Sequence, residues 1–145
     1  MFAELSANPA DFELEITESA LLGNDQKTIL MLTQLQDVGF SIAIDDFGTG
    51  YSSLAYLRRY PIDCLKIDKS FIQNLNEFEA ITGLIVSLAK VMNLRIIVEG
   101  VETEAQLTWL KEQGCHEYQG YLFSPPVPPD LFVSYRSGHR YCISP

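Results

Sequence analysis

The sequence predicts an α/β fold, an incomplete (β/α) barrel with about five parallel strands and surrounding helices. Short β-type runs alternate with segments of helical periodicity, which is typical of βα units and a mainly parallel sheet. In four of these runs, one alternating set of residues is apolar and the other is small or charged. A sheet covered on both faces needs apolar residues in both sets, so the pattern favours a barrel whose polar set faces inward.

Five short runs are expected to form the strands. In the first run, Phe12, Leu14 and Ile16 alternate with Glu13 and Glu15, and similar alternation recurs in the next three. The runs are, in chain order, "FELEIT" (12–17), "FSIAID" (40–45), "DCLKID" (63–68), "LRIIVE" (94–99) and "YQGYLF" (118–123).

Four segments between the strands are expected to be helical. Gly39 ends the first segment (25–38) and Pro61 ends the second (52–60). A Thr-x-x-Gln capping box opens the fourth segment (103–113), which stops at Gly114. The chain after Pro128 is expected to form one short helix before it frays. The four segments are Asp25–Val38, Ser52–Tyr60, Glu79–Asn93 and Thr103–Gln113. The expected apolar faces are Ile29, Leu32, Leu35 and Val38 in the first segment, and Ile81, Leu84, Ile85, Leu88 and Met92 in the third.

The composition is ordinary for a soluble globular domain with one core, since 47% of the 145 residues are apolar and 20% are charged. The net charge of −9 argues against binding to a nucleic-acid polymer, which needs clustered Lys and Arg. An acidic protein that handles a phosphate ester would need cations as intermediaries. No linker or repeat divides the chain, so we expect one domain.

The three cysteines are widely spaced and form no CxxC pair, which predicts reduced thiols and a cytoplasmic location. No signal peptide is expected at the start of the chain, and no stretch approaches the ~18 apolar residues of a membrane span. We therefore expect no membrane contact from this segment, although a larger parent protein could be tethered to a membrane.

Three acids and a lysine of the inward set fall at or near the ends of their predicted strands: Glu15, Asp45, Lys66 and Glu99. The C-terminal strand ends form the active face of a (β/α) barrel, so these side chains are expected around one mouth. Acids and a lysine on successive strands would also suit an enolase-type proton abstraction with a lysine base.

Asp45 and Asp46 stand side by side where an apolar run meets a Gly-Thr-Gly loop. Adjacent carboxylates repel each other, and bound Mg²⁺ or Mn²⁺ would offset that repulsion. With acids at the other strand ends, the pair predicts a metal site. The structural alternative is an Asx turn at Asp46, with Ser52 or Ser53 capping the next helix.

Three further polar residues have both a functional and a structural interpretation. An inward Lys66 would hold a phosphate or activate a water, or would form an ion pair with Asp68 or another acid. Glu18, three residues after Glu15, is interpreted as a tether for the glycine loop rather than a ligand. Gln119 would hydrogen-bond substrate or serve as a buried amide.

Four long segments resemble the EAL family of cyclic di-GMP phosphodiesterases, over residues 12 to about 129. They are "ELEITES", "IDDFGTGYSSLAYLRRYPIDCLKIDKSFI", "IVEGVETEAQLTWL" and "CHEYQGYLFSPPVP". The resemblance implies a TIM-like (β/α) barrel that hydrolyses cyclic di-GMP to linear pGpG with two Mg²⁺ or Mn²⁺ ions. Residues 1–145 would then be one partial EAL domain, with 130–145 as a C-terminal tail.

The resemblance also implies roles for single residues. Glu15, Asp45 and Asp46 match metal ligands of the family. Lys66 matches the lysine that orients or activates the attacking water, and Glu99 matches a glutamate that supports the metal–water cluster.

Two other positions match residues around the catalytic centre. Gln119 matches a glutamine that reaches the substrate, and Glu18 matches a glutamate that stabilises the DDFGTG loop. The family associates this loop with dimerisation and activation.

Two family features are absent from the sequence, the Glu-Ala-Leu motif and an asparagine ligand, and both would precede residue 1. We therefore expect the chain to be the C-terminal portion of an EAL domain. Its exposed sheet edges should make it self-associate or be poorly stable. Because two metal ligands are missing, it should hydrolyse cyclic di-GMP weakly or not at all by itself. The expected partners are cyclic di-GMP and either a second copy of the chain or the N-terminal part of the domain. The alternative function is a non-catalytic cyclic di-GMP binding, regulatory or dimerisation module.

Overall fold

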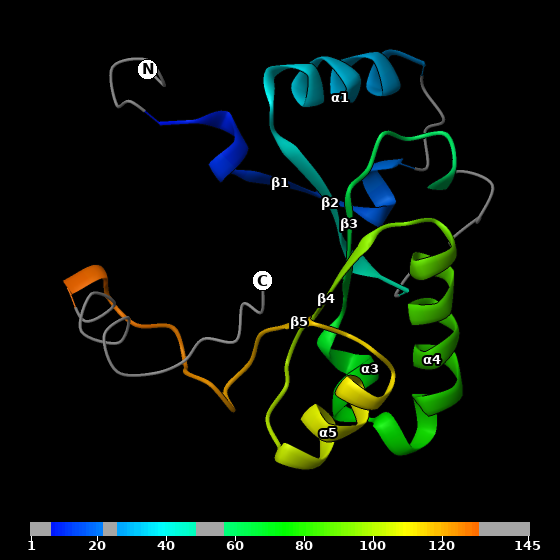
Figure 1. Cartoon of the computed structure of the whole chain (residues 1–145), viewed down its shortest axis with the longest axis vertical. Coiled ribbons are helices and arrows are strands. Elements are labelled where there is room, and N and C mark those ends of the chain that lie inside the picture. Colours follow the sequence, from blue (N-terminus) through cyan, green and yellow to red (C-terminus); the bar gives the residue numbers. More distant parts are fainter. Residues whose placement is uncertain (1–6, 22–25, 49–56, 131–145) are drawn as a thin grey trace.

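The computed structural model describes residues 7–21, 26–48 and 57–130. Within them, five parallel strands form one sheet in the order β1-β2-β3-β4-β5, so every strand lies beside its neighbour in the sequence (Figure 1). This confirms the predicted α/β class and the predicted parallel sheet. The strands are β1 (Glu13–Thr17), β2 (Ser41–Phe47), β3 (Cys64–Ile67), β4 (Arg95–Val98) and β5 (Glu117–Tyr118).

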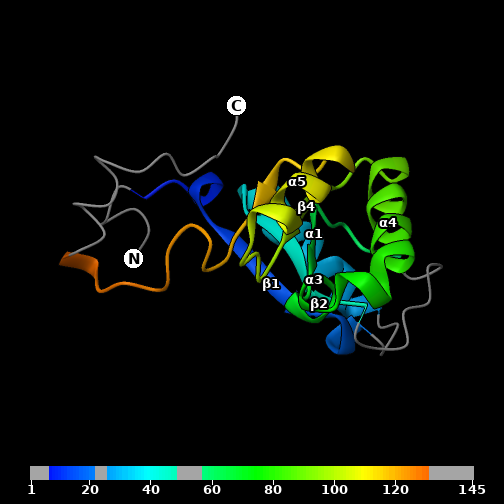
Figure 2. The ribbon, with the colours of Figure 1, turned by 90° about the horizontal axis from the view of Figure 1, so that it is seen from below.

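Helices lie between the strands along the chain. Figures 1 and 2 show α4 to one side of the strands, whereas the chain that follows β5 extends to the opposite side. The helices are α1 (Gln26–Val38), α3 (Lys69–Gln73), α4 (Leu75–Val91) and α5 (Glu104–Glu112), and two 3₁₀ turns are η1 (Pro9–Asp11) and η2 (Glu18–Leu21).

The apolar set of strand residues forms the core beneath these helices. Ile42, Ile44, Leu65, Ile67 and Val98 are all fully buried in one cluster, and α1 and α4 pack on β2 and β4. At roughly 25 cal/mol per Å² of apolar surface, burying such side chains contributes about 1.5–3 kcal/mol each. The sheet is therefore anchored to its helices by one alternating set of residues, as the sequence predicts.

The opposite face of the sheet is polar and curved. An ion pair joins Arg95 on β4 to Glu13 on β1, and another joins Lys66 on β3 to Glu15, which also lies on β1. Side chains stand upright on a sheet, so contacts across two or three strands favour a sheet that curves toward this face. Figure 1 shows the strand direction rotating from β1 to β4, and the arrangement fits part of a barrel.

Most predicted elements are confirmed within one or two residues, with two extensions and one error. Strand β2 continues two residues beyond Asp45, and α4 begins four residues earlier than Glu79. The prediction of a strand over 118–123 is wrong, because only Glu117–Tyr118 pair with β4. After them the backbone turns, and the amides of Phe123 and Ser124 donate to the carbonyl of Gly120.

The predicted apolar faces of two helices are partly wrong. Val38 on α1 is exposed, and so are Ile81 and Leu84 on α4. The buried residues of α4 are Thr82, Ile85, Val86 and Ala89, so the predicted burial of Ile85 is confirmed and the other three were not predicted. The apolar surface of α4 is wider than the strip that the sheet covers, and Thr82 can be buried because its hydroxyl donates to the carbonyl of Phe78.

Local signals explain where two helices begin. Thr103 and Gln106 form the predicted capping box at the start of α5, with reciprocal side-chain to backbone hydrogen bonds. The short helix α3 was not predicted, and the Asp68 side chain caps it by accepting from the amide of Ser70 at 2.9 Å.

Some predictions fall on parts of the chain outside the described ranges. They include most of the predicted helix Ser52–Tyr60, the capping residues Ser52 and Ser53, and the tail after residue 130. Across the three described ranges, no helix is both long enough and apolar enough to pass through a bilayer.

Candidate functional site

The ammonium group of Lys66 lies among three carboxylates at one end of the polar face. Lys66 Nζ is 2.6 Å from Glu15 Oε1, 2.7 Å from Glu99 Oε1 and 3.1 Å from Asp45 Oδ1. These are four of the residues that the sequence places at one mouth, and the structure brings them together. We call them the Lys66 cluster: Lys66, Glu15, Asp45 and Glu99.

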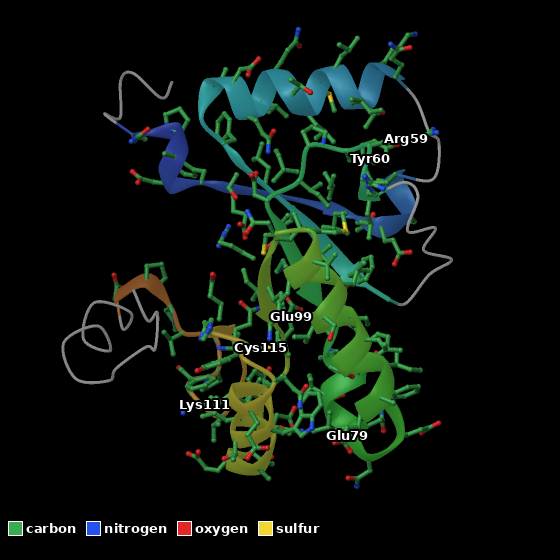
Figure 3. All side chains as sticks on the ribbon, turned by 45° about the vertical axis from the view of Figure 1, so that its right-hand side comes forward. Arg59, Tyr60, Glu79, Glu99, Lys111 and Cys115 are labelled. Carbon is green, nitrogen blue, oxygen red and sulfur yellow. The ribbon has the colours of Figure 1, made fainter. Side chains whose placement is uncertain are left out.

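Strand register explains this convergence. Glu15 pairs with Ala43 on β2, and Asp45 lies two residues further along that strand. Lys66 is the third residue of β3, and Glu99 follows the last residue of β4. All four lie at or near the carboxyl ends of parallel strands, which meet at one edge of the sheet. Glu99 lies close to the middle of the molecule, as Figure 3 shows.

A β-bulge shapes the position of the two aspartates. The β2–β3 register shifts between Ile44 and Phe47, so that Asp45 and Asp46 lie opposite Lys66 alone. Asp46 has a φ of 54°, a left-handed conformation that is rare outside glycine. Lys66 contacts Asp45 rather than Asp46, which is exposed. The bulge therefore separates the directions of two neighbouring carboxylates.

Glu99 and Gln119 are coupled directly. Gln119 Nε2 donates to Glu99 Oε1 at 2.9 Å, and the same oxygen atom faces Lys66 Nζ. Backbone bonds fix Gln119 beside β4, because its amide donates to Val98 O at 2.9 Å and its carbonyl accepts from Val101 N at 3.1 Å. Gln119 is exposed, so its amide is not the buried group that the structural interpretation requires.

The ammonium of Lys66 is strongly held in its charged form. Burial alone would lower the pKa of Lys66, but hydrogen bonds with Glu15, Glu99 and Asp45 raise it well above its usual range. In this arrangement Lys66 is a fixed positive charge. It can hold an anion or orient a water, but it is a poor proton acceptor at neutral pH, which disfavours a lysine-base enolase reaction.

Glu18 connects η2 to the residue that follows β2. Its side chain is 8% exposed, and its Oε2 accepts from the backbone amide of Gly48 at 3.0 Å. Gly48 has a φ of 97°, which favours glycine. Glu18 thus touches the start of the loop that follows Asp45 and Asp46.

Replacing Glu18 by alanine is expected to lower the free energy of unfolding by about 2 kcal/mol, because a partly buried hydrogen bond to a carboxylate is lost. Glu18→Gln keeps an oxygen acceptor for the Gly48 amide and should lose less than half as much. Urea denaturation of both variants measures the difference. Equal stability of Glu18→Ala and the wild-type chain would contradict this role for Glu18.

The carboxylates of the Lys66 cluster bear on whether this site can hold a metal ion. No group of three or more His, Cys, Asp or Glu side chains in the described ranges is arranged to hold an ion by itself. Nevertheless, three carboxylate oxygens lie within 3.1 Å of one ammonium, and one of them, Asp45 Oδ1, is buried. Carboxylate oxygens suit hard divalent ions, so the residues fit such an ion with additional ligands.

A second charged group lies on the same face, toward the other end of the strands. Arg95 pairs with Glu13 and Glu117 and donates to Ser41 Oγ at 3.1 Å. Burial alone would lower the pKa of Arg95, but the Glu13 carboxylate raises it. These charges satisfy one another, so this group contributes to the sheet and not to the mouth.

The cysteines of the described ranges are unsuited to nucleophilic catalysis. Cys64 and Cys115 are free and buried. Burial, with the nearby Glu13 carboxylate, raises the pKa of Cys64 to about 12, and burial raises the pKa of Cys115 to about 11. Both thiols stay protonated at neutral pH, and the third cysteine, Cys142, lies outside the described ranges.

A cavity of about 680 Å³ opens beside Glu99 and Gln119. Lys69, Glu102 and Tyr121 line it and were not singled out from the sequence. The signal that could have identified them is their closeness in sequence to predicted site residues, since Lys69 lies three positions after Lys66, Glu102 three after Glu99 and Tyr121 two after Gln119. The cavity extends the site from the Lys66 cluster toward the chain after β5.

Known proteins resemble this chain over most of its length. The family model described as EAL domain matches residues 2–126. Over 136 residues the chain is 46% identical to the cyclic di-GMP phosphodiesterase NbdA of Pseudomonas aeruginosa, covering 92% of this chain and 17% of NbdA. The chain therefore spans about a sixth of the length of that relative.

Two solved structures extend the comparison. A structure titled as the PaMucR phosphodiesterase in complex with c-di-GMP matches with a TM-score of 0.85 and 43% identity, over 90% of this chain and 54% of that one. A manganese/cy-diGMP complex of Klebsiella pneumoniae BlrP1 matches with a TM-score of 0.78 and 31% identity, over 86% and 32%.

Proposed function

The chain belongs to the EAL domain family, and from this membership we propose that it forms the carboxylate-rich part of a cyclic di-GMP phosphodiesterase. The reaction would be hydrolysis of one phosphodiester of cyclic di-GMP to give linear pGpG. The fold supports this, because the five parallel strands and their helices form part of a TIM-like barrel.

The observation that carries the proposal is the Lys66 cluster. Three carboxylates and one ammonium at the mouth of a partial barrel leave an excess of negative charge. A phosphodiester is itself an anion, so it can approach only if further cations neutralise these acids. This requirement matches divalent-metal hydrolysis, and related EAL structures carry titles naming manganese or calcium with the same ligand.

Each residue of the site has a proposed task. Glu15, Asp45 and Asp46 would hold the divalent ions, Mg²⁺ or Mn²⁺, which when bound supply an activated water and neutralise the phosphate oxygens. Lys66 would orient the attacking water and stabilise negative charge beside the phosphorus. Glu99 holds the Lys66 ammonium in place.

Two residues around the cluster complete the proposal. Gln119 donates a hydrogen bond to Glu99 and lines the cavity, where it would contact the substrate. Glu18 would stabilise the loop that follows the aspartates through Gly48.

A second candidate function is binding of cyclic di-GMP without turnover, for regulation or dimerisation. It is favoured by the finding that no three carboxylates of the described residues alone form a metal-holding group. Strands β1 and β5 each have one edge unpaired by the described strands, and a second copy or further βα units of an EAL domain could pair there. Both candidates share the ligand and differ in turnover.

The test is hydrolysis of cyclic di-GMP by the chain with Mg²⁺ or Mn²⁺, alone and mixed with the part of the PaMucR domain that lies outside the matched region. We expect pGpG to form in the mixture, with little or none from the chain alone. Glu99→Gln should slow its formation by roughly 10²-fold, because it removes a carboxylate that positions the charge-stabilising Lys66 ammonium. Lys111→Met, an exposed substitution on α5, is the control and should leave the rate unchanged.

Ion-exchange chromatography of the products measures this rate, and calorimetry measures binding in parallel. Binding of cyclic di-GMP without formation of pGpG, both by the chain alone and in the mixture, would favour the second candidate. Absence of both binding and turnover would contradict both candidates.

A further inference from the structure

The cavity beside the Lys66 cluster is lined by acids and by one lysine. Glu99 and Glu102 contribute carboxylates, and Lys69 at the start of α3 contributes the ammonium. The chain as a whole carries a net charge of −9. An anionic ligand in this cavity therefore meets repulsion from two carboxylates and attraction from Lys69.

The charges around the cavity differ in whether they are already paired. Glu99 contacts Lys66 and Gln119, and Glu102 accepts from Gln73 Nε2 at 3.0 Å. For Lys69, no carboxylate lies within ion-pair distance in the part of the chain that the structure describes. Its ammonium is thus available to a ligand, whereas Lys66 is committed to three carboxylates.

The base of the Lys69 side chain is held firmly beside the cluster. Asp68 caps α3 through the amide of Ser70, which fixes the backbone at its first residue. Gly100 follows Glu99 with a φ of 70°, and a Cβ atom there would overlap Lys69 Cβ and lie 3.1 Å from Lys69 Cα. A glycine next to Glu99 therefore lets α3 approach closely and brings Lys69 to the cavity wall.

A cyclic dinucleotide carries two phosphodiesters, and only one of them can react at the Lys66 cluster at a time. The other remains an anion that must lie elsewhere on an acidic protein. We propose that Lys69 binds this second, non-reacting phosphodiester and thereby favours cyclic dinucleotides over ligands with a single phosphate. The proposal rests on the function proposed above, and it adds a specificity-determining residue.

The test compares Lys69→Met with Lys111→Met, which removes the exposed lysine that Figure 3 labels on α5. Lys111 does not belong to the residues that line the cavity. Calorimetry with the whole 145-residue chain and Ca²⁺ measures affinity for cyclic di-GMP and for GMP, which has one phosphate. We expect Lys69→Met to weaken cyclic di-GMP binding about 10-fold, since a charge-assisted contact is lost, and to change GMP binding less than 2-fold.

Two further variables sharpen the result. Lys69→Arg keeps the charge and should retain most of the affinity for cyclic di-GMP. Added salt should weaken cyclic di-GMP binding less in Lys69→Met than in the wild-type chain, because one ion pair fewer is screened. Thermal unfolding of each variant checks that the fold is unchanged.

The outcomes separate this inference from the function on which it rests. Unchanged cyclic di-GMP binding in Lys69→Met would overturn the role of Lys69 and leave the proposed function standing. Equal losses for GMP and cyclic di-GMP, or equal losses in Lys69→Met and Lys111→Met, would also overturn it. If the wild-type chain neither binds nor hydrolyses cyclic di-GMP, alone or mixed with the part of the PaMucR domain outside the matched region, the proposed function fails, and the role of Lys69 fails with it.

Discussion

Replacing Lys66 by methionine is expected to lower the free energy of unfolding at pH 7 by about 3 kcal/mol. The substitution keeps most of the side-chain volume but leaves Glu15, Asp45 and Glu99 facing one another without the ammonium between them. Removing one partner of a fully buried ion pair costs about 3–5 kcal/mol. The lower end applies here because the three carboxylates are partly exposed, with side-chain exposures of 19–48%.

The pH dependence of this difference follows from the raised pKa of Lys66. Burial opposes the charge, but the hydrogen bonds to Glu15, Glu99 and Asp45 prevail, so the folded-state pKa lies above the unfolded one. The ammonium therefore stabilises the fold in full below pH ~10.4, the usual lysine value, and its contribution is lost as the pH rises through the folded-state pKa. The stability difference between the wild-type chain and Lys66→Met should be constant from pH 7 to 10 and shrink above that.

Urea denaturation across this pH range measures the effect. Lys111→Met serves as the matched control, because its ammonium is exposed and its loss should change stability by less than about 0.5 kcal/mol. A Lys66→Met chain as stable as the wild type at pH 7 would show that the three carboxylates do not depend on this ammonium.

Gly120→Ala is expected to cost about 3 kcal/mol of unfolding free energy. A Cβ atom at Gly120 would overlap the carbonyl oxygen and the nitrogen of Val101 and lie 2.7 Å from its carbonyl carbon. These are backbone atoms of the loop that follows Glu99, so no side chain can move aside to make room. Overpacking typically costs 1–3 kcal/mol, and a clash with backbone belongs at the upper end.

The clash would also disturb the site. Val101 N donates to Gln119 O, and Leu122 N donates to Val101 O, so the two loops are joined on both sides of Gly120. Pushing them apart would displace Gln119 from Glu99. We therefore expect Gly120→Ala to weaken cyclic di-GMP binding as well as to lower stability. Binding is measured at low temperature, where the variant chain remains folded.

Gly83→Ala is the matched control for this substitution. Gly83 lies inside α4, where the nearest atom to an added Cβ is Gln113 Oε1 at an ordinary 3.8 Å. Alanine there should raise stability by about 0.5–1 kcal/mol, because it favours a helix more than glycine does. Denaturation curves that show both glycine substitutions changing stability in the same direction would contradict the argument.

Much of the secondary structure could be predicted because its signals are local. The alternating residues of "FELEIT" and "FSIAID" and the Thr103–Gln106 capping box depend only on nearby positions, and all of them are confirmed. Errors arise where distant contacts decide the outcome. "YQGYLF" has a strand-like composition, but Gly120 lies against Val101, and the chain turns there instead of pairing with β4.

The sequence alone determined the α/β class, the parallel sheet, the inward polar set and the strand ends that carry Glu15, Asp45, Lys66 and Glu99. Each of these depends on a short motif or on the two-residue period of a strand. That period is fixed because successive Cβ atoms of a strand point to opposite faces of the sheet. Only the tertiary structure decided that Lys66 contacts three acids at once, that Asp46 adopts a left-handed backbone conformation, and that Lys69 lines a cavity beside Glu99. These depend on sheet curvature, a β-bulge and close loop packing, in which residues tens of positions apart share one space.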